Sequence, residues 1–208
     1  MKAFIKIVVE RQDSIISFNW DLLLEICCKD LSLCVSYYNS PSNGLHISKP
    51  HGSLNLAEIS RARYDAMKNS MNIHNIFIDW ENGEKIVLRA SDPCDAANRI
   101  ISPTGATLLV EPNARKSYTS PWIQLQWQRA LNMTKEAEEI CVIGYSLPET
   151  DFRPRILFQL AGVNANPDKR ILLIGPNANN VAGRYRKYIN LPIDPIEKPW
   201  FEWLTTQA

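Results

Sequence analysis

The chain has 208 residues, 45% of them hydrophobic, and its 23 basic and 22 acidic side chains leave a formal net charge of +1. This composition excludes disordered and fibrous proteins, and a chain of this length buries roughly 70% of the surface that its unfolded form exposes. The balanced charge argues against nucleic acid as a partner, and without a membrane-length apolar run or a secretory cleavage site we expect no membrane partner and a cytoplasmic location.

The first half of the chain alternates short apolar runs with polar turns. Residues 1–12 place apolar side chains at near-helical spacing, which predicts an amphipathic helix, with a strand over 4–9 as the alternative. A strand over 14–18, a polar turn and a helix from Leu22 follow. The further expectations are a strand over 33–38, a turn at 41–44, a helix over 57–68, a hairpin of 75–80 and 85–89 around Glu81-Asn82-Gly83, and a strand over 106–110.

The second half has the pattern of a parallel crossover unit. Ser120 followed by Pro121 is typical of a helix N-terminus, and the helix is expected to run to about Glu139. Apolar runs at 140–146 and 170–175 flank a helical pattern at 151–163. A strand, a helix and a strand in about 35 residues indicate a right-handed crossover between parallel strands.

These elements predict an α/β fold, a Rossmann-like, mainly parallel sheet with helices on both faces. We expect one domain over 1–190, with 54–105 as a possible small irregular insertion. Residues 191–208, rich in proline and aromatic residues, are expected to form an irregular C-terminal strap.

The cysteines indicate neither a disulfide framework nor a metal site. Their number is odd and no CxxC pair occurs, which favours reduced thiols packed in the interior. We therefore expect no metal. The five are Cys27, Cys28, Cys34, Cys94 and Cys141.

Polar residues that follow predicted strands are the candidate site residues, because ligands of parallel sheets bind beyond the carboxyl ends of the strands. Asn19 and Asp21 could hold a water and a hydroxyl-bearing ligand, or Asp21 could simply cap the following helix. His51, before Gly52, could act as a general base or be a structural histidine. His46 and His74 have no such context.

The second half offers further candidates with equally ordinary alternatives. Gly144 permits close approach of a nucleotide and Ser146 offers a hydroxyl to a ribose or phosphate, although a glycine there is also common in turns. Asp151 is most simply a helix N-cap. The basic residues at 184, 186 and 187 could touch phosphate, but such a run usually forms a solvated helix face.

Three segments taken in order resemble the sirtuin-like domains of bacterial antiphage NAD-degrading proteins. They are SFNWDLLLE at 17–25, KPHGSLN at 49–55 and IGYSLPETD at 143–151. The resemblance implies that Asn19 positions a water, that Asp21 fixes the ribose or nicotinamide, and that His51 acts as the base. It also implies NAD-binding roles for Ser17, Gly52, Gly144, Tyr145, Ser146 and Asn177, with NAD as substrate.

Two departures from that family affect the expected activity. Only Cys94 lies between Ser53 and Glu139, so the zinc ribbon of sirtuin deacylases is missing, which favours simple NAD hydrolysis to nicotinamide and ADP-ribose in antiphage defence. No glycine precedes Gly44, so the family's N-terminal glycine-rich phosphate loop is absent. The alternative is therefore a catalytically inactive, truncated module that binds an ADP-ribose-like nucleotide or a protein partner. We further expect a homo-oligomer or pairing with another chain.

Overall fold

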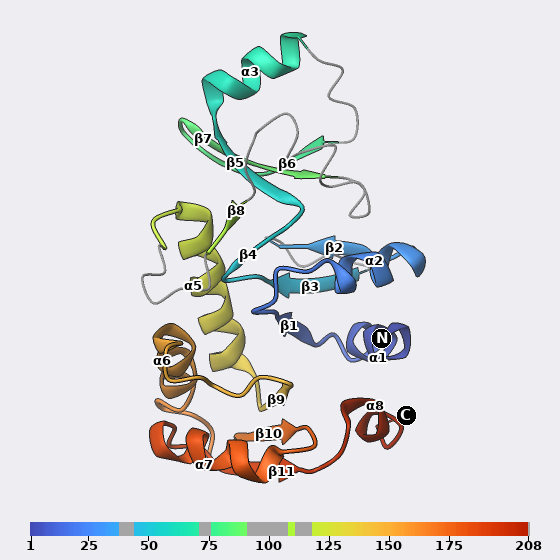
Figure 1. Cartoon of the computed structure of the whole chain (residues 1–208), viewed down its shortest axis with the longest axis vertical. Helices are drawn as coiled ribbons and strands as arrows, with labels where there is room; N and C mark the ends of the chain where they lie inside the picture. The colour runs from blue at the N-terminus through green and yellow to red at the C-terminus, as the bar shows by residue number, and fades with distance from the viewer. Residues whose placement is uncertain (38–43, 71–75, 91–107, 111–117, 208) are drawn as a thin grey trace. The chain divides into compact units, whose positions relative to one another are not determined.

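The computed structural model describes residues 1–37, 44–70, 76–90, 108–110 and 118–207. It divides into two compact units, Met1–Trp127 and Gln128–Ala208 (Figure 1). The division falls within helix α5 (Pro121–Glu136). The fold is mixed α/β, with both parallel and antiparallel sheets.

The first unit begins with a small parallel sheet. Its strands are ordered β1-β3-β2, and β3 pairs in parallel with both neighbours. Helix α1 turns Ile5 and Val8 inward, which confirms the predicted amphipathic helix. The elements are α1 (Lys2–Glu10), β1 (Ser14–Ile16), α2 (Leu23–Asp30), β2 (Cys34–Ser36) and β3 (Gly44–Ser48).

Antiparallel strands make up the rest of the first unit. A short pair joins β4 (Gly52–Ser53) to β8 (Leu108–Leu109). A three-stranded sheet is ordered β5-β7-β6, and Met67 packs helix α3 against it together with Ile59 and Ile86. These elements are β5 (Leu56–Ser60), α3 (Arg61–Ser70), β6 (Ile76–Asn82) and β7 (Lys85–Ala90).

This region confirms one local prediction and corrects another. The hairpin around 81–83 is present, with Gly83 at φ +58°. The helix predicted over 57–68 begins only at Arg61, because residues 56–60 pair with β7 along their whole length and bury Leu56, Ala57 and Ile59. Residues 41–43 of the predicted turn lie outside the described residues.

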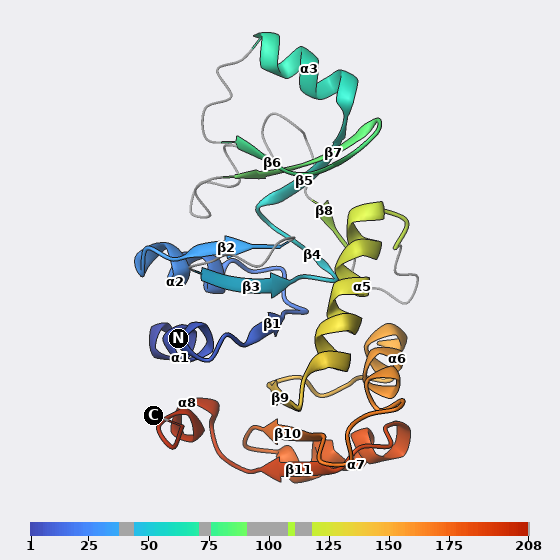
Figure 2. The same cartoon turned by 180° about the vertical axis from the view of Figure 1, so that it is seen from behind.

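The second unit contains the predicted crossover. Strand β9, helix α6 and strand β10 follow one another along the chain. Strands β9 and β10 are parallel, and the sheet order is β11-β10-β9 (Figure 2). Helices α6 and α7 pack on this sheet through a core that includes Phe158, Leu173 and Tyr185. The elements are β9 (Glu139–Ile143), α6 (Phe152–Ala161), β10 (Arg170–Ile174), α7 (Ala178–Tyr188), β11 (Ile193–Ile196) and α8 (Trp200–Leu204).

The C-terminal segment is more regular than expected. Residues 193–196 form an outer strand of this sheet, parallel to β10, and α8 buries Trp203 and Leu204. The prediction of an irregular strap was wrong because Ile193 joins the core, and Pro195 is tolerated in a strand at the edge of a sheet. None of the helices in the described ranges is long and apolar enough to cross a bilayer.

The packing prediction for the cysteines holds for only some of them. Cys27 and Cys28 are buried on α2, whereas Cys34 and Cys141 are exposed on strands, which corrects the expectation for these two. All four are free thiols. Cys94 lies outside the described residues.

Candidate functional site

The parallel pairing of β1 with β3 brings two of the predicted segments to one edge of the first unit's sheet. Ile16 is in register with Ser48, so residues 17–21 and 49–53 both leave the sheet at the carboxyl ends of neighbouring strands. Ser17 N–H donates to Ser48 O at 2.8 Å, and Leu54 N–H donates to Trp20 O at 3.1 Å. Segment 17–21 is therefore bonded directly to Ser48 and Leu54, the residues on either side of 49–53.

Asn19 and Asp21 lie on the exposed side of this edge. The Asp21 carboxylate accepts a hydrogen bond through Oδ1 from Leu23 N–H at 3.1 Å, which forms an Asx turn as the simpler interpretation predicted, although the N-cap residue of α2 is Leu22. Asn19 N–H donates to Ser17 Oγ at 3.3 Å. Within the described ranges, the Asn19 amide and the Asp21 Oδ2 atom make no hydrogen bond to protein, which leaves both groups available to a ligand.

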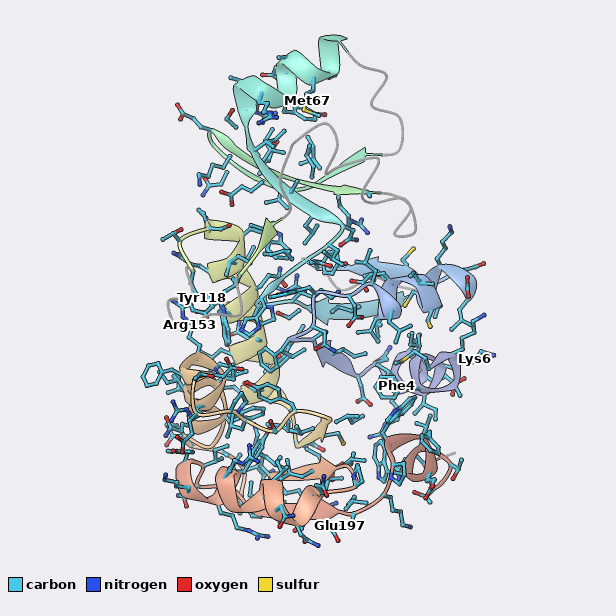
Figure 3. The ribbon with its side chains drawn as sticks, viewed as in Figure 1. Phe4, Lys6, Met67, Tyr118, Arg153 and Glu197 are labelled. Carbon is cyan, nitrogen blue, oxygen red and sulfur yellow. The ribbon has the colours of Figure 1, made fainter. Side chains whose placement is uncertain are left out.

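His51 lies against three aromatic rings and is only 7% exposed. Its ring centroid is 5.4 Å from that of Phe18, 5.7 Å from Trp127 and 6.4 Å from Tyr118. Tyr118, labelled in Figure 3, reaches the cluster from the segment before α5. Because Phe18 is adjacent to Asn19, this ring contact connects His51 to the segment that carries the predicted amide and acid.

The glycine after His51 is required by the backbone. Gly52 has φ +86°, and a Cβ there would lie 2.0 Å from Leu108 O in the paired strand β8. His51 O also accepts from Val110 N–H at 2.8 Å. The His-Gly pair therefore has a structural explanation in the β4–β8 pairing, in addition to any role in binding.

A buried polar cluster lies behind these segments, and the sequence analysis did not single it out. Lys49 Nζ is 2.6 Å from Glu25 Oε1, and the two side chains are 0% and 4% exposed. Tyr37 Oη donates to the same Glu25 oxygen at 2.5 Å, and Asn55 Nδ2 donates to Tyr37 Oη at 3.3 Å. One sequence signal could have indicated this cluster: Glu25 stands inside the apolar run LLLEICC, where an acid must be buried and paired.

Gln126 on α5 closes the cluster from another side. Its side-chain amide donates to Tyr37 O at 2.9 Å and accepts from Lys49 N–H at 3.1 Å, while its main-chain oxygen accepts from Ser48 Oγ at 2.8 Å. Gln126 is fully buried. One residue thus fixes the ends of both β2 and β3.

Burial and the Glu25 charge shift the titration of neighbouring groups. Burial raises the pKa of Tyr37 well above its usual value, and the nearby Glu25 carboxylate raises it further, so the phenol keeps its proton and donates to Glu25. Burial, followed by the charge of Glu25, raises the pKa of Cys28 to about 12. Cys28 is therefore a packed thiol rather than a nucleophile.

The other predicted NAD-binding residues lie in the second unit, at the ends of β9 and β10. Gly144 has φ +69° with open space around its Cβ position, so its backbone conformation, rather than crowding, requires glycine. Tyr145 Oη donates to Asp151 Oδ2 at 2.7 Å, and Tyr185 Oη donates to Tyr145 O at 3.1 Å. Asp151 precedes α6 as predicted, but its side chain makes no cap bond to that helix.

Ser146 and Asn177 are exposed at the same strand ends, since β9 and β10 are parallel. Arg184 Nη1 donates to Ser146 O at 3.3 Å, and Arg186 Nη2 donates to Ile193 O at 2.9 Å. Two of the three predicted basic residues thus bind main-chain oxygens. In the first unit, the structure brings the following predicted residues to one sheet edge: Ser17, Asn19, Asp21, His51 and Gly52. In the second unit, it brings together Gly144, Tyr145, Ser146 and Asn177.

Within the part of the chain that the structure describes, no three His, Cys, Asp or Glu side chains are grouped to hold a metal ion. Comparisons of the chain with protein-family models, with curated proteins and with solved structures found no match.

Proposed function

We propose that the protein is an NAD glycohydrolase of the sirtuin-like type, which cleaves NAD to nicotinamide and ADP-ribose in antiphage defence. The observation that carries the proposal is the bonding of segment 17–21 to Ser48 and Leu54, which flank 49–53, at one sheet edge. This arrangement places an amide, a carboxylate and an imidazole on adjoining segments beyond the carboxyl ends of parallel strands, where such sheets bind ligands. We extend the proposal to a Rossmann-like fold class, because the sheets β1-β3-β2 and β11-β10-β9 are each parallel.

The proposed reaction needs only water and groups already present. The bond between the ribose C1′ and the nicotinamide ring nitrogen breaks, and its electron pair neutralises the pyridinium. Water attacks C1′ and gives its proton to His51, yielding nicotinamide, ADP-ribose and a proton. The Asn19 amide orients this water, and the Asp21 carboxylate stabilises the positive charge that develops on the ribose.

The aromatic rings around His51 suit this chemistry. Phe18, Trp127 and Tyr118 exclude solvent from most of the imidazole and leave 7% of the residue exposed. In the second unit, Ser146 and Asn177 are exposed at the ends of β9 and β10.

Nicotinamide release from NAD by the purified chain, measured by chromatography, tests the proposal. Asn19→Ala and His51→Gln are expected to lower kcat by about 10²–10⁴-fold, the usual contribution of a positioned base or water-orienting group. Asn180→Ala, at an exposed position on α7, is the matched control and should keep the wild-type rate. Wild-type rates in both site variants would refute the assigned roles.

A second candidate is a catalytically inactive module that binds an ADP-ribose-like nucleotide or a protein partner. The Asx-turn bond of Asp21 favours this candidate, because it occupies Oδ1 and leaves only Oδ2 to a ligand. Calorimetry with ADP-ribose separates the two functions. Binding of ADP-ribose without NAD turnover would support the inactive module, and turnover would exclude it.

A further inference from the structure

Lys49 is buried at the junction of the two segments that carry the proposed reactive groups. An ammonium has three N–H donors, and all three of its donors have acceptors here. Nζ lies 2.6 Å from Glu25 Oε1, 2.5 Å from Asp21 O and 3.1 Å from Ser53 Oγ. Two of these acceptors belong to different segments, Asp21 to 17–21 and Ser53 to 49–53.

The stability of the fold does not by itself account for a charged pair at this place. Replacing a buried ion pair by apolar side chains of similar size is often neutral or stabilising, because removing two charges from water is costly. This pair is also incompletely satisfied: Glu25 Oε2 is buried and has no hydrogen-bond partner among the residues that the structure describes. An apolar pair could fill the same volume but could not bind Asp21 O and Ser53 Oγ.

We infer that Lys49 is a positioning residue, whose ammonium fixes segments 17–21 and 49–53 relative to each other so that Asn19, Asp21 and His51 act on one substrate. Glu25 supplies the counter-charge that keeps the ammonium in place, and Tyr37 orients Glu25 by donating to the same oxygen. The positioning role of Lys49 rests on the proposed NAD hydrolysis, whereas the hydrogen bonds of its ammonium do not depend on a substrate.

Three variants separate positioning from simple stabilisation. Lys49→Met leaves the Glu25 charge buried and is expected to destabilise the chain. Glu25→Gln combined with Lys49→Met removes both charges at nearly constant volume, so the unfolding midpoint should recover to within a few degrees of wild type. Glu25→Gln alone removes the counter-charge but leaves Asp21 O and Ser53 Oγ as acceptors for the ammonium, so its kcat should fall less than that of the double variant.

The double variant is the decisive one. Although folded, it lacks the bond from the Lys49 ammonium to Asp21 O, so kcat for NAD hydrolysis should fall at least tenfold while KM changes little. Amide hydrogen exchange gives a readout that does not depend on activity. Exchange at Leu54, which donates to Trp20 O, and at Leu23, which donates to Asp21 Oδ1, should accelerate at least tenfold, whereas exchange at Ile171 in the second unit should not change.

The outcomes distinguish this inference from the proposed function. If wild type hydrolyses NAD and the double variant keeps its kcat, the positioning role is overturned while the function stands. If wild type does not hydrolyse NAD, the function fails, and exchange at Leu54 and Leu23 decides whether Lys49 holds the segments. Should the double variant not fold, Glu25→Leu combined with Lys49→Met replaces the ion pair by apolar side chains and also removes the bond to Asp21 O; unchanged kcat and unchanged exchange at Leu54 would then overturn the inference.

Discussion

Replacing Gly52 by alanine tests whether the β4–β8 pairing fixes the backbone beside His51. Gly52 has φ +86°, and a non-glycine residue in this region costs about 1–2 kcal/mol. The new Cβ would also meet Leu108 O at 2.0 Å, so the paired strands must separate, and overpacking of this kind costs a further 1–3 kcal/mol or so. We expect Gly52→Ala to lower the free energy of unfolding by about 2–5 kcal/mol.

Gly83 is the matched control within the same unit. It also has positive φ, at +58°, but a Cβ there would meet nothing within 4 Å. Gly83→Ala should therefore lose only the conformational part, about 1–2 kcal/mol. In urea, a difference of about 2 kcal/mol between the variants separates their midpoints by about 1 M at a slope of about 2 kcal/mol per M. Equal losses in the two variants would show that the contact with Leu108 O does not matter.

Other consequences of burial are open to direct measurement. The folded chain keeps the Tyr37 proton above the pH at which the unfolded chain releases it, because the pKa of Tyr37 is raised in the fold. The free energy of unfolding should therefore fall as pH rises above about 10. Urea titrations from pH 9 to 11 measure this fall, which should be less steep in Tyr37→Phe. Lys169→Met should cost about 1–3 kcal/mol in thermal unfolding, because it leaves the main-chain oxygens of Thr134 and Lys135 near the end of α5 without their donor. Lys187→Met, at an exposed site, is the control and should unfold at nearly the wild-type temperature. Alkylation followed by mass spectrometry should modify Cys34 rapidly and Cys28 only upon unfolding; rapid modification of Cys28 in the folded chain would contradict its burial and raised pKa.

Local patterns predicted the elements of the fold well where a segment's own residues decide its structure. The helix at the N-terminus, the hairpin at Gly83 and the crossover over 139–174 follow from periodicity and turn chemistry. Strand β5 was missed because residues 56–60 become a strand by pairing with β7, about 30 residues further along the chain. Such long-range pairing leaves little trace in a short window of sequence.

The same distinction applies to the candidate site. Strand-end reasoning predicted which residues follow β1 and β3, and the parallel register places them at one edge. It did not predict Lys49, whose importance comes from partners at 21, 25 and 53. It also left open two interpretations of Asp21, and the Asx-turn bond to Leu23 shows that a structural role is present whatever the residue does with a ligand.

Position 126 requires a side chain that is both a hydrogen-bond donor and an acceptor, and Gln126 supplies both. Its amide donates to the carbonyl that follows β2 and accepts from the N–H that follows β3, much as a peptide group of an adjoining strand would. Glutamate has the same length but no proton to donate to Tyr37 O, and asparagine is one methylene too short. An apolar side chain would leave both main-chain groups buried without a hydrogen-bond partner. Of the twenty amino acids, glutamine alone combines the length, the donor and the acceptor that this helix must present to the sheet.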